Sequence, residues 1–267
     1  PTLNLTNNPT ICEGQSVSLS VNGANNYQWF PSTGLNNTIG STVVANPSFS
    51  TFYSVIGTAN NGCSDTISTT VSVNPIPVLS TFPNNIDLCL GDTATLYVSG
   101  ADTYIWNPNQ IIGLANLDTI KVSPSSSTIY SVLGIDNLGC SSSSSISVNV
   151  NITPNIEVNA DQQSICIGES ALLSASGGVQ YSWQPYVSLS SNIGNVVSAN
   201  PSFSTTYLVT GTDINSCSSW DTITILVNQL PVLSVNKPVS TICEGETDNL
   251  IVSGANNYIW SPALGLN

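Results

Sequence analysis

Apolar and polar residues alternate along much of this chain with a period of two. Early in the chain, Val17, Leu19 and Val21 alternate with serines, and Tyr27 and Trp29 also stand two residues apart. Because successive side chains of a β-strand point to opposite faces, this alternation predicts half-buried strands. No apolar pattern with a period of 3.6 residues reaches the length of a helix. We therefore predict an all-β protein.

Turn-forming residues separate the predicted strands. The first 62 residues contain the turn sequences NGANN at 22–26, PSTG at 31–34, ANPS at 45–48 and NNG at 60–62. Short strands with a turn at roughly every eight to twelve residues are typical of a two-sheet sandwich. In such a sandwich we expect the tryptophan to pack between the sheets.

The whole pattern recurs with a 77-residue period. Three series of residues keep this period: the tryptophans Trp29, Trp106, Trp183 and Trp260, the cysteines Cys12, Cys89, Cys166 and Cys243, and the cysteines Cys63, Cys140 and Cys217. Such self-similarity is the signature of a repeat protein, and the four tryptophans are its predicted core residues.

The period predicts tandem sandwiches that are Ig-like in architecture. The predicted domains are repeat 1 at 1–76, repeat 2 at 77–153, repeat 3 at 154–230 and the N-terminal part of a fourth repeat at 231–267. Because the fourth copy stops before its second cysteine, we expect that it is truncated from something longer.

Each complete repeat holds one cysteine of each series, and a domain of this size buries only a modest core. We therefore predict one disulfide within each repeat: Cys12–Cys63, Cys89–Cys140 and Cys166–Cys217, with the partner of Cys243 missing. Each bridge would close a loop of about fifty residues and contribute roughly 4 kcal/mol in the chain-entropy model. Reduced, buried thiols are the alternative. Paired cysteines indicate an oxidising, extracellular setting.

The joints between the repeats are short. Only NPIP separates Val73 from Val78, and the later joints read NITP and NQLP. Linkers of this length that contain proline are not flexible tethers, so we predict a stiff rod that gains about 35 Å per repeat.

The charge of the chain limits its partners. Two Lys and Arg residues stand against 15 Asp and Glu, which gives a formal net charge of −13, and there is no histidine. Phosphate backbones and anionic lipid would repel such a chain, so we expect no nucleic-acid partner. No apolar run reaches the roughly 18 residues of a transmembrane helix, so we also expect no direct membrane insertion.

Four short motifs give the repeat a family resemblance. They are CEGQS at 12–16, GANNYQWFP at 23–31, TFYSVIGT at 51–58 and NNGC at 60–63. Together they resemble the PKD-like/Ig-like repeats of giant cell-surface adhesins of Bacteroidota, such as the SprB-like gliding-motility adhesins. The resemblance implies export by type IX secretion and a role in surface adhesion or gliding motility. It also implies that threonines in D-T-aliphatic sequences are O-glycosylated, and four fit: Thr66, Thr93, Thr119 and Thr222.

Candidate chemistry is sparse. A Ser/His/Asp or Cys/His arrangement is impossible without histidine, and the acidic residues do not keep the repeat period, so we expect no enzyme. Ca²⁺ is the one candidate cofactor, because Asp136 and Asp213 occupy the same position in repeats 2 and 3 and Asp87 and Asp161 lie near joints. The alternative is that these aspartates are solvated turn residues. Trp220 breaks the repeat pattern on an outward face and is a candidate ligand contact. The alternative is that a neighbouring loop or domain covers it.

These features predict a structural stalk segment of an extracellular adhesin, in a fibre attached to the outer membrane. The expected partners are neighbouring repeats of the same long chain, with surface polysaccharide or other cell-surface proteins as further candidates. Two alternatives stay open. One is a carbohydrate-binding repeat array, and the other is a self-assembling filament subunit that another chain completes by strand donation.

Overall fold

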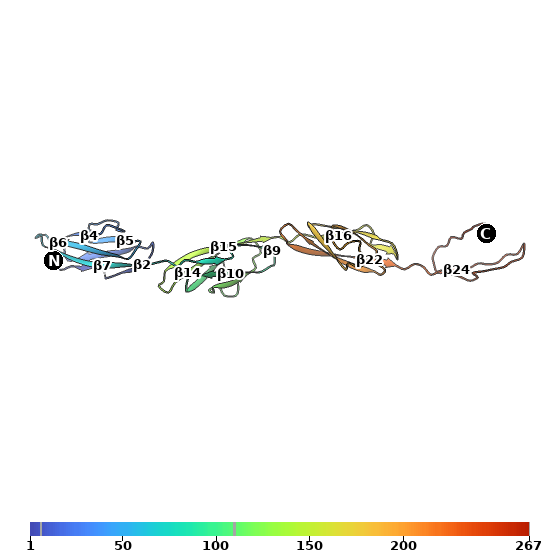
Figure 1. Cartoon of the computed structure of the whole chain (residues 1–267), viewed down its shortest axis with the longest axis horizontal. Coiled ribbons are helices and arrows are strands. Elements are labelled where there is room, and N and C mark those ends of the chain that lie inside the picture. Colours follow the sequence, from blue (N-terminus) through green and yellow to red (C-terminus); the bar gives the residue numbers. More distant parts are fainter. Residues whose placement is uncertain (6, 109–110, 267) are drawn as a thin grey trace. The chain divides into compact units, whose positions relative to one another are not determined.

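The computed structural model describes residues 1–5, 7–108 and 111–266 (Figure 1). In this described part every regular element is a β-strand, which confirms the all-β prediction. None of it forms a helix with the length and hydrophobicity that crossing a membrane requires. The chain divides into two compact units, Pro1–Asn151 and Ile152–Asn267. Three separate hydrophobic cores lie within the ranges 3–73, 79–148 and 156–227.

The first core is enclosed by a sandwich of two sheets. Its strands are β1 (Asn4–Leu5), β2 (Thr10–Cys12), β3 (Val17–Asn22), β4 (Asn26–Phe30), β5 (Thr42–Ala45), β6 (Thr51–Thr58) and β7 (Ser64–Asn74). One sheet has the order β1-β3-β5 and the other has the order β2-β7-β6-β4. All neighbouring strands are antiparallel except β2 and β7, which run parallel.

The second sandwich repeats this arrangement. Its strands are β8 (Ser80–Phe82), β9 (Asn85–Cys89), β10 (Ala94–Ser99), β11 (Thr103–Asn107), β12 (Ile111–Ile112), β13 (Thr119–Val122), β14 (Thr128–Ile135) and β15 (Ser141–Asn151). The sheets have the orders β8-β10-β13-β12 and β9-β15-β14-β11, and β9 again runs parallel to the last strand, β15.

The third sandwich lies in the second compact unit. Its strands are β16 (Glu157–Ala160), β17 (Ser164–Cys166), β18 (Ala171–Ser176), β19 (Gln180–Gln184), β20 (Val196–Ala199), β21 (Thr205–Thr212) and β22 (Ser218–Asn228). Its sheets are β16-β18-β20 and β17-β22-β21-β19, with β17 parallel to β22. The prediction of tandem Ig-like β-sandwich repeats is therefore confirmed.

One tryptophan lies at the centre of each complete sandwich. Trp29, Trp106 and Trp183 are no more than 1% exposed. Each indole Nε1 donates a hydrogen bond to a backbone carbonyl eleven residues later, at 2.9, 2.9 and 2.8 Å respectively. A buried N–H without a partner would cost free energy, so this bond lets the ring fill the core without that penalty.

The fourth tryptophan departs from the prediction. Trp260 was expected in a core but is 38% exposed. In the complete repeats the tryptophan strand pairs with an eight-residue strand, as Trp29 does with Val55 of β6. The described part of the fourth copy contains only β23 (Ser234–Val235) paired with β24 (Val252–Ser253), so no such strand covers the ring.

The first core residue after each joint is held tightly. The side chain of Leu79 lies against Gly134, where an added Cβ would come within 2.5 Å of its Cδ2 atom. Leu3 occupies the same place against Gly57. Val73 packs on the first core and Leu79 packs on the second. Only residues 74–78 therefore lie between the two cores.

Repeat 3 offers a matched pair of tryptophans for testing the role of the central ring. Trp183→Ala should lower the free energy of unfolding of this repeat by about 3–5 kcal/mol, because it leaves a large cavity. Trp220→Ala should change it by about 0.5 kcal/mol or less, because Trp220 is 65% exposed. Hydrogen exchange of peptides from β18 and β21 in denaturant measures both. Equal effects of the two substitutions would contradict the central role of Trp183.

Candidate functional site

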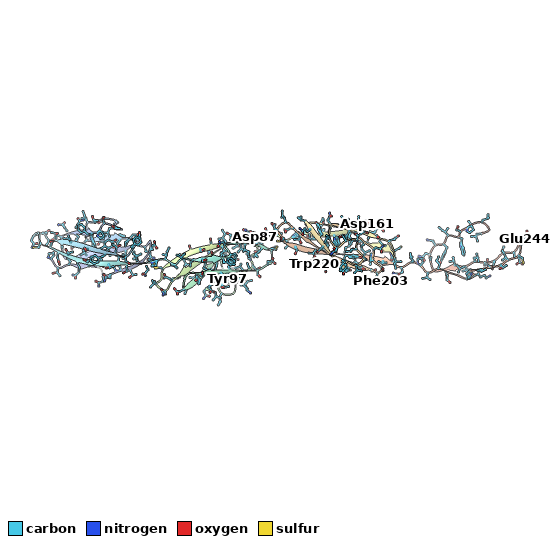
Figure 2. All side chains as sticks on the ribbon, in the orientation of Figure 1. Asp87, Tyr97, Asp161, Phe203, Trp220 and Glu244 are labelled. Atoms are coloured by element: carbon cyan, nitrogen blue, oxygen red, sulfur yellow. A yellow bond between two sulfur atoms is a disulfide. The ribbon has the colours of Figure 1, made fainter. Side chains whose placement is uncertain are left out.

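The most informative chemical feature of the chain is a disulfide between two repeats. Cys12 of repeat 1 is bonded to Cys140 of repeat 2, with a Cα–Cα distance of 5.5 Å and a sequence separation of 128 residues. Both cysteines lie in the first compact unit. Figure 2 draws the side chains on the ribbon.

This bond corrects the predicted pairing within repeats. Cys12–Cys63 and Cys89–Cys140 are wrong because Cys12 and Cys140 are bonded to each other. Cys166–Cys217 is wrong because Cys166 is free whereas Cys217 is in a disulfide.

The parallel pairing of β2 and β7 explains the error. Cys12 lies opposite Asn74, at the end of β7, whereas Cys63 immediately precedes the start of that strand. Eleven residues of extended strand span roughly 35 Å, but two bridged cysteines need Cα atoms within about 7 Å of each other. The two cysteines of one repeat therefore lie at opposite ends of its sandwich and cannot meet.

A tight turn after β2 positions Cys12. The backbone N–H of Cys12 donates to the Gln15 side-chain oxygen at 3.1 Å, and the Gln15 N–H donates to the Cys12 carbonyl at 2.9 Å. The next residue, Glu13, donates its N–H to the carbonyl of Asn74 at 2.8 Å. Gly14 has a φ of +81°, a conformation that glycine adopts without strain. The turn thus attaches Cys12 to the end of β7, where the chain leaves repeat 1.

A hairpin between β14 and β15 positions Cys140. The Asp136 Oδ1 atom accepts hydrogen bonds from the backbone N–H groups of Leu138 at 3.0 Å and of Cys140 at 2.8 Å. The Asp136 N–H donates to the Cys140 carbonyl at 2.9 Å. Cys140 is fully buried. The carboxylate therefore orders the loop that presents the sulfur to repeat 1.

The bridge runs in parallel with the joint. The backbone connection from β7 to β8 consists of residues 75–79, and the disulfide is a second covalent connection between the same two repeats. Two connections restrict the relative rotation of two bodies more than one does. This is the only inter-repeat bridge whose two partners are both identified among the described residues.

The remaining cysteines fall into two groups. Cys89 and Cys217 are disulfide-bonded, whereas Cys63, Cys166 and Cys243 are free and exposed. Sequence reasoning identified the equivalent cysteines correctly but not the pairing. The period alone allows several sequence separations between two bonded cysteines. It carries no information about which strands run parallel.

The candidate calcium aspartates have partners within the protein. Asp213 accepts from Asn215 and Cys217 as Asp136 does in repeat 2. Asp87 accepts from the Asn149 side chain at 2.9 Å, and Asp161 accepts from the Leu172 N–H at 2.7 Å. Among the described residues, no group of three or more His, Cys, Asp or Glu side chains is placed to hold a metal ion. These aspartates thus have a structural use, and calcium binding stays a prediction.

The other candidate surface residues are accessible. Thr66, Thr93 and Thr222 are exposed and Thr119 is half-buried. Trp220 lies on β22, where it pairs with Thr210 of β21 and leaves 65% of its surface exposed. Figure 2 labels this residue.

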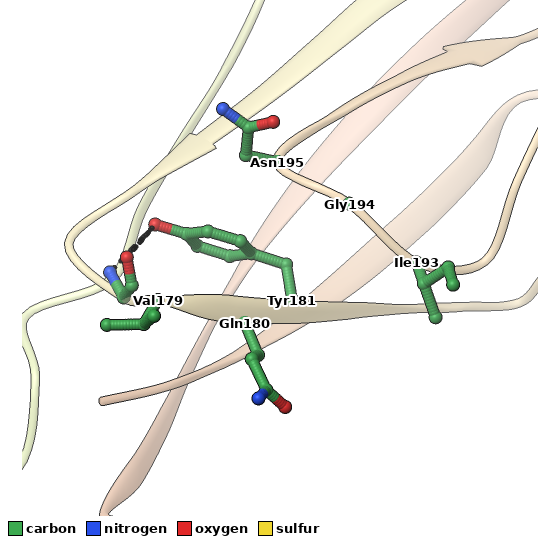
Figure 3. Close-up of a pocket in the computed structure, with 7 residues that line it drawn as sticks. Val179, Gln180, Tyr181, Ile193, Gly194 and Asn195 are labelled. Carbon is green, nitrogen blue, oxygen red and sulfur yellow. Dashed lines mark hydrogen bonds between the residues drawn. The ribbon is translucent and has the colours of Figure 1, made fainter. Parts of the chain in front are cut away.

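Repeat 3 has an open groove near the start of β19 (Figure 3). Gly178, Val179, Gln180 and Tyr181 line one side of it, and Ile193, Gly194 and Asn195 line the other. The Tyr181 hydroxyl accepts from the Gly178 N–H and donates to the Gly178 carbonyl, both at 2.8 Å. Tyr27 makes the same pair of bonds to Ala24 beside an equivalent groove in repeat 1. The tyrosine therefore clamps a turn, and no nucleophile with an adjacent base lines the groove.

Comparisons with known proteins found only distant structural similarities. No protein-family model matches the chain, and no curated protein sequence matches it. Among solved structures, the chain is similar to the N-terminal eight Ig domains of Down Syndrome Cell Adhesion Molecule, with a TM-score of 0.41 and 15% identity. That match covers 88% of this chain and 37% of the other, so the chain spans little more than a third of it.

Two further structures are similar at the same level. An I-band fragment from titin matches with a TM-score of 0.38 and 14% identity, over 85% of this chain and 98% of the fragment. A Ca²⁺-stabilised adhesin that helps an Antarctic bacterium bind ice matches with a TM-score of 0.33 and 13% identity, over 88% and 77%. At these scores the similarities support no argument about function.

Removing the bridge should make the joint more accessible. In the double variant Cys12→Ser/Cys140→Ser, we expect elastase to cut residues 75–79 several-fold faster, because the joint can then extend into the protease. Mass spectrometry of limited digests measures the rate. Cys63→Ser is the matched control, since it removes a free cysteine and leaves the bridge in place. Identical rates in all three proteins would show that the bridge does not restrain the joint.

Proposed function

We propose that this chain is a structural segment of an extracellular stalk that holds an adhesive element away from a cell surface. The disulfide between Cys12 and Cys140 carries the proposal. A bridge placed across a joint contributes to the connection between domains rather than to the interior of one domain. That is the property that a stalk under tension or bending needs and that an enzyme or a freely jointed binding array does not.

Three further properties support a stiff extracellular rod. Each joint has only five residues between regular strands, as in residues 75–79, 152–156 and 229–233. Disulfides form and persist in oxidising compartments outside the cytosol. A surface with a net charge of −13 and only 6% charged residues is soluble and repels anionic surfaces.

The finer assignment rests on the family resemblance. We propose a giant adhesin of the Bacteroidota type, exported by type IX secretion, attached to the outer membrane as a fibre and used in adhesion or gliding motility. Its repeats would carry O-glycans, have no enzymatic activity and have other repeats of the same chain as their main partners. Calcium is not needed for the proposed role.

Deleting one complete repeat tests the stalk proposal. Removal of residues 77–153 joins two equivalent positions of the 77-residue pattern. Cys217 then takes the former position of Cys140, where it can bond to Cys12. We expect cells that carry this deletion in the full chain to keep their attachment or gliding, because a stalk needs length and not a particular repeat. Surface display is checked with an antibody against repeat 3. Complete loss of attachment at normal display would mean that the repeats themselves bind the ligand.

A carbohydrate-binding array is the second candidate, favoured only by the exposure of Trp220. Aromatic rings that are open to solvent can stack on sugars. In that case Trp220→Ala would abolish saturable glycan binding by the isolated chain, whereas the stalk proposal predicts no such binding to begin with.

The proposed glycosylation has its own test. Peptides from native material that contain Thr66, Thr93, Thr119 and Thr222 should carry an added glycan mass that β-elimination removes. The nearby Thr69 is a control within repeat 1, because it is only 2% exposed and should be unmodified. Four bare threonines in native material would overturn this part of the proposal.

A further inference from the structure

We infer that Cys12–Cys140 is one instance of a general rule, in which the first cysteine of each repeat bonds to the second cysteine of the following repeat. Under this rule Cys63 is the attachment point for the repeat before it, and Cys166 and Cys243 are attachment points for repeats that follow theirs. The partners are thus other repeats of the same chain. The inference rests on the cysteine geometry and does not depend on an adhesive role.

The first cysteines share one backbone frame whether or not they are bonded. In the three complete repeats, the residue after the first cysteine donates its N–H to the carbonyl of the asparagine at the end of the last strand: Glu13 to Asn74 at 2.8 Å, Leu90 to Asn151 at 2.8 Å and Ile167 to Asn228 at 2.9 Å. The carbonyls of Cys12, Cys89, Cys166 and Cys243 each accept a hydrogen bond from the N–H three residues later. The free Cys166 is therefore positioned as the bonded Cys12 is.

The second cysteines also share one frame. The carbonyl of each accepts from the N–H four residues earlier: Cys63 from Ala59 at 2.9 Å, Cys140 from Asp136 at 2.9 Å and Cys217 from Asp213 at 2.8 Å. The bonded Cys140 is fully buried, whereas the free Cys63 is exposed on the equivalent hairpin of repeat 1. The two hairpins share this backbone hydrogen bond, although the N–H of Cys63 donates to Asn61 and that of Cys140 donates to Asp136.

The spacing of the bonded cysteines agrees with the rule. Cys12 and Cys140 are 128 residues apart. Cys89 and Cys217 are both disulfide-bonded, and they are separated by the same number of residues. The rule pairs them with each other. At a separation of 128 residues, the rule places the partner of Cys63 in a preceding repeat and the partner of Cys166 in a following repeat.

Each bridge forms by oxidation of two thiols. The two sulfurs lose two protons and two electrons in forming the S–S bond, and a disulfide-exchange oxidant accepts them and becomes a dithiol. Because the folded repeat keeps its own two cysteines apart, the oxidised product is a bond between neighbours.

The consequence is a pair of continuous covalent lines along the array. In one line, the backbone segments 63–89 and 217–243 are joined by the bond between Cys89 and Cys217. The other line contains the backbone segment 140–166, which the bond from Cys140 joins to Cys12 of repeat 1. Each of these 26-residue steps contains a last strand, a joint and the first strands of the next repeat. Residues 13–62, which include β3 to β6, lie outside both lines, so tension does not pass through most of the core.

Bridging therefore limits extension. Each line has a contour of roughly 95 Å for every two repeats, or about 50 Å per repeat, whereas an unbridged repeat extends to roughly 260 Å. We expect a fully oxidised array to stretch little before its covalent bonds carry the force, even if the sandwiches lose their packing.

Peptide mapping of the full native chain with blocked thiols tests the pairing directly. Cleavage before aspartates releases residues 87–91 (DLCLG), which contain Cys89, and residues 213–220 (DINSCSSW), which contain Cys217. We expect these two peptides to be joined before reduction, and the peptide that contains Cys63 to be joined to one from the preceding repeat.

Each alternative gives a different map. A bond between 87–91 and 136–160 would restore pairing within repeats and overturn the rule. Cys63 recovered as a blocked thiol from the full chain would overturn it as well. A bond from Cys63 to a second molecule, seen in a mixture of isotope-labelled and unlabelled chains, would replace it with polymerisation.

Single-molecule extension of this chain between its termini measures the mechanical consequence. With both bridges, the shortest covalent path runs through residues 1–12, 89–140 and 217–267, which extend to roughly 400 Å, against roughly 900 Å after reduction. Cys89→Ser should give an intermediate length of roughly 480 Å, and Cys63→Ser should leave the length unchanged. Full extension of the unreduced wild-type chain would overturn the inference. None of these outcomes depends on whether cells use the protein for adhesion.

Discussion

The parallel pairing of β2 with β7 is the constraint on which the chemistry of this chain depends. It places Cys12 beside Asn74, where the chain leaves the sandwich, although Cys12 is near the beginning of the repeat in sequence. The same pairing holds for β9 with β15 and β17 with β22. A cysteine at the exit of repeat 1 then reaches the hairpin between β14 and β15, the last two strands of repeat 2. The direction of one short strand thus decides whether a disulfide stabilises a domain or a joint.

The sandwiches themselves are closed without an internal bridge. Each complete core buries a tryptophan, and Tyr53, Tyr130 and Tyr207 are fully buried beside it. In the described residues no buried side-chain nitrogen or oxygen lacks a hydrogen-bond partner. Burial of this aromatic surface and the satisfied side-chain hydrogen bonds stabilise each sandwich without a bond between its own two cysteines. The cysteines are therefore available for a role between domains.

The sequence predicts more about the fold than about the site. Alternation along β3, β6 and β7 indicates the strands and the buried faces, and the repeat period identifies Trp29, Trp106 and Trp183 as equivalent core residues. The pairing of cysteines does not follow from the same information. Bonding Cys63 to Cys12, to Cys89 or to a cysteine two repeats away would keep the period equally well. Choosing among such pairings requires the direction of β2 relative to β7, which is a tertiary property that no local pattern of residues encodes. Trp260 is exposed because the described residues of the fourth copy contain no counterpart of β6 that pairs with the tryptophan strand.

Folding and oxidation must then occur in a definite order. In an unfolded chain Cys63 is a nearer partner for Cys12 than Cys140 is, since the cost of loop closure rises with the length of the loop. Once repeat 1 has folded, an eleven-residue strand separates the Cys12 and Cys63 sulfurs by roughly 35 Å, and the nearer partner becomes inaccessible. Cys140 takes its native position when the hairpin between β14 and β15 forms and the Asp136 carboxylate accepts a hydrogen bond from its N–H. Folding of repeat 1 before oxidation therefore favours the native pairing, because it separates Cys12 from Cys63.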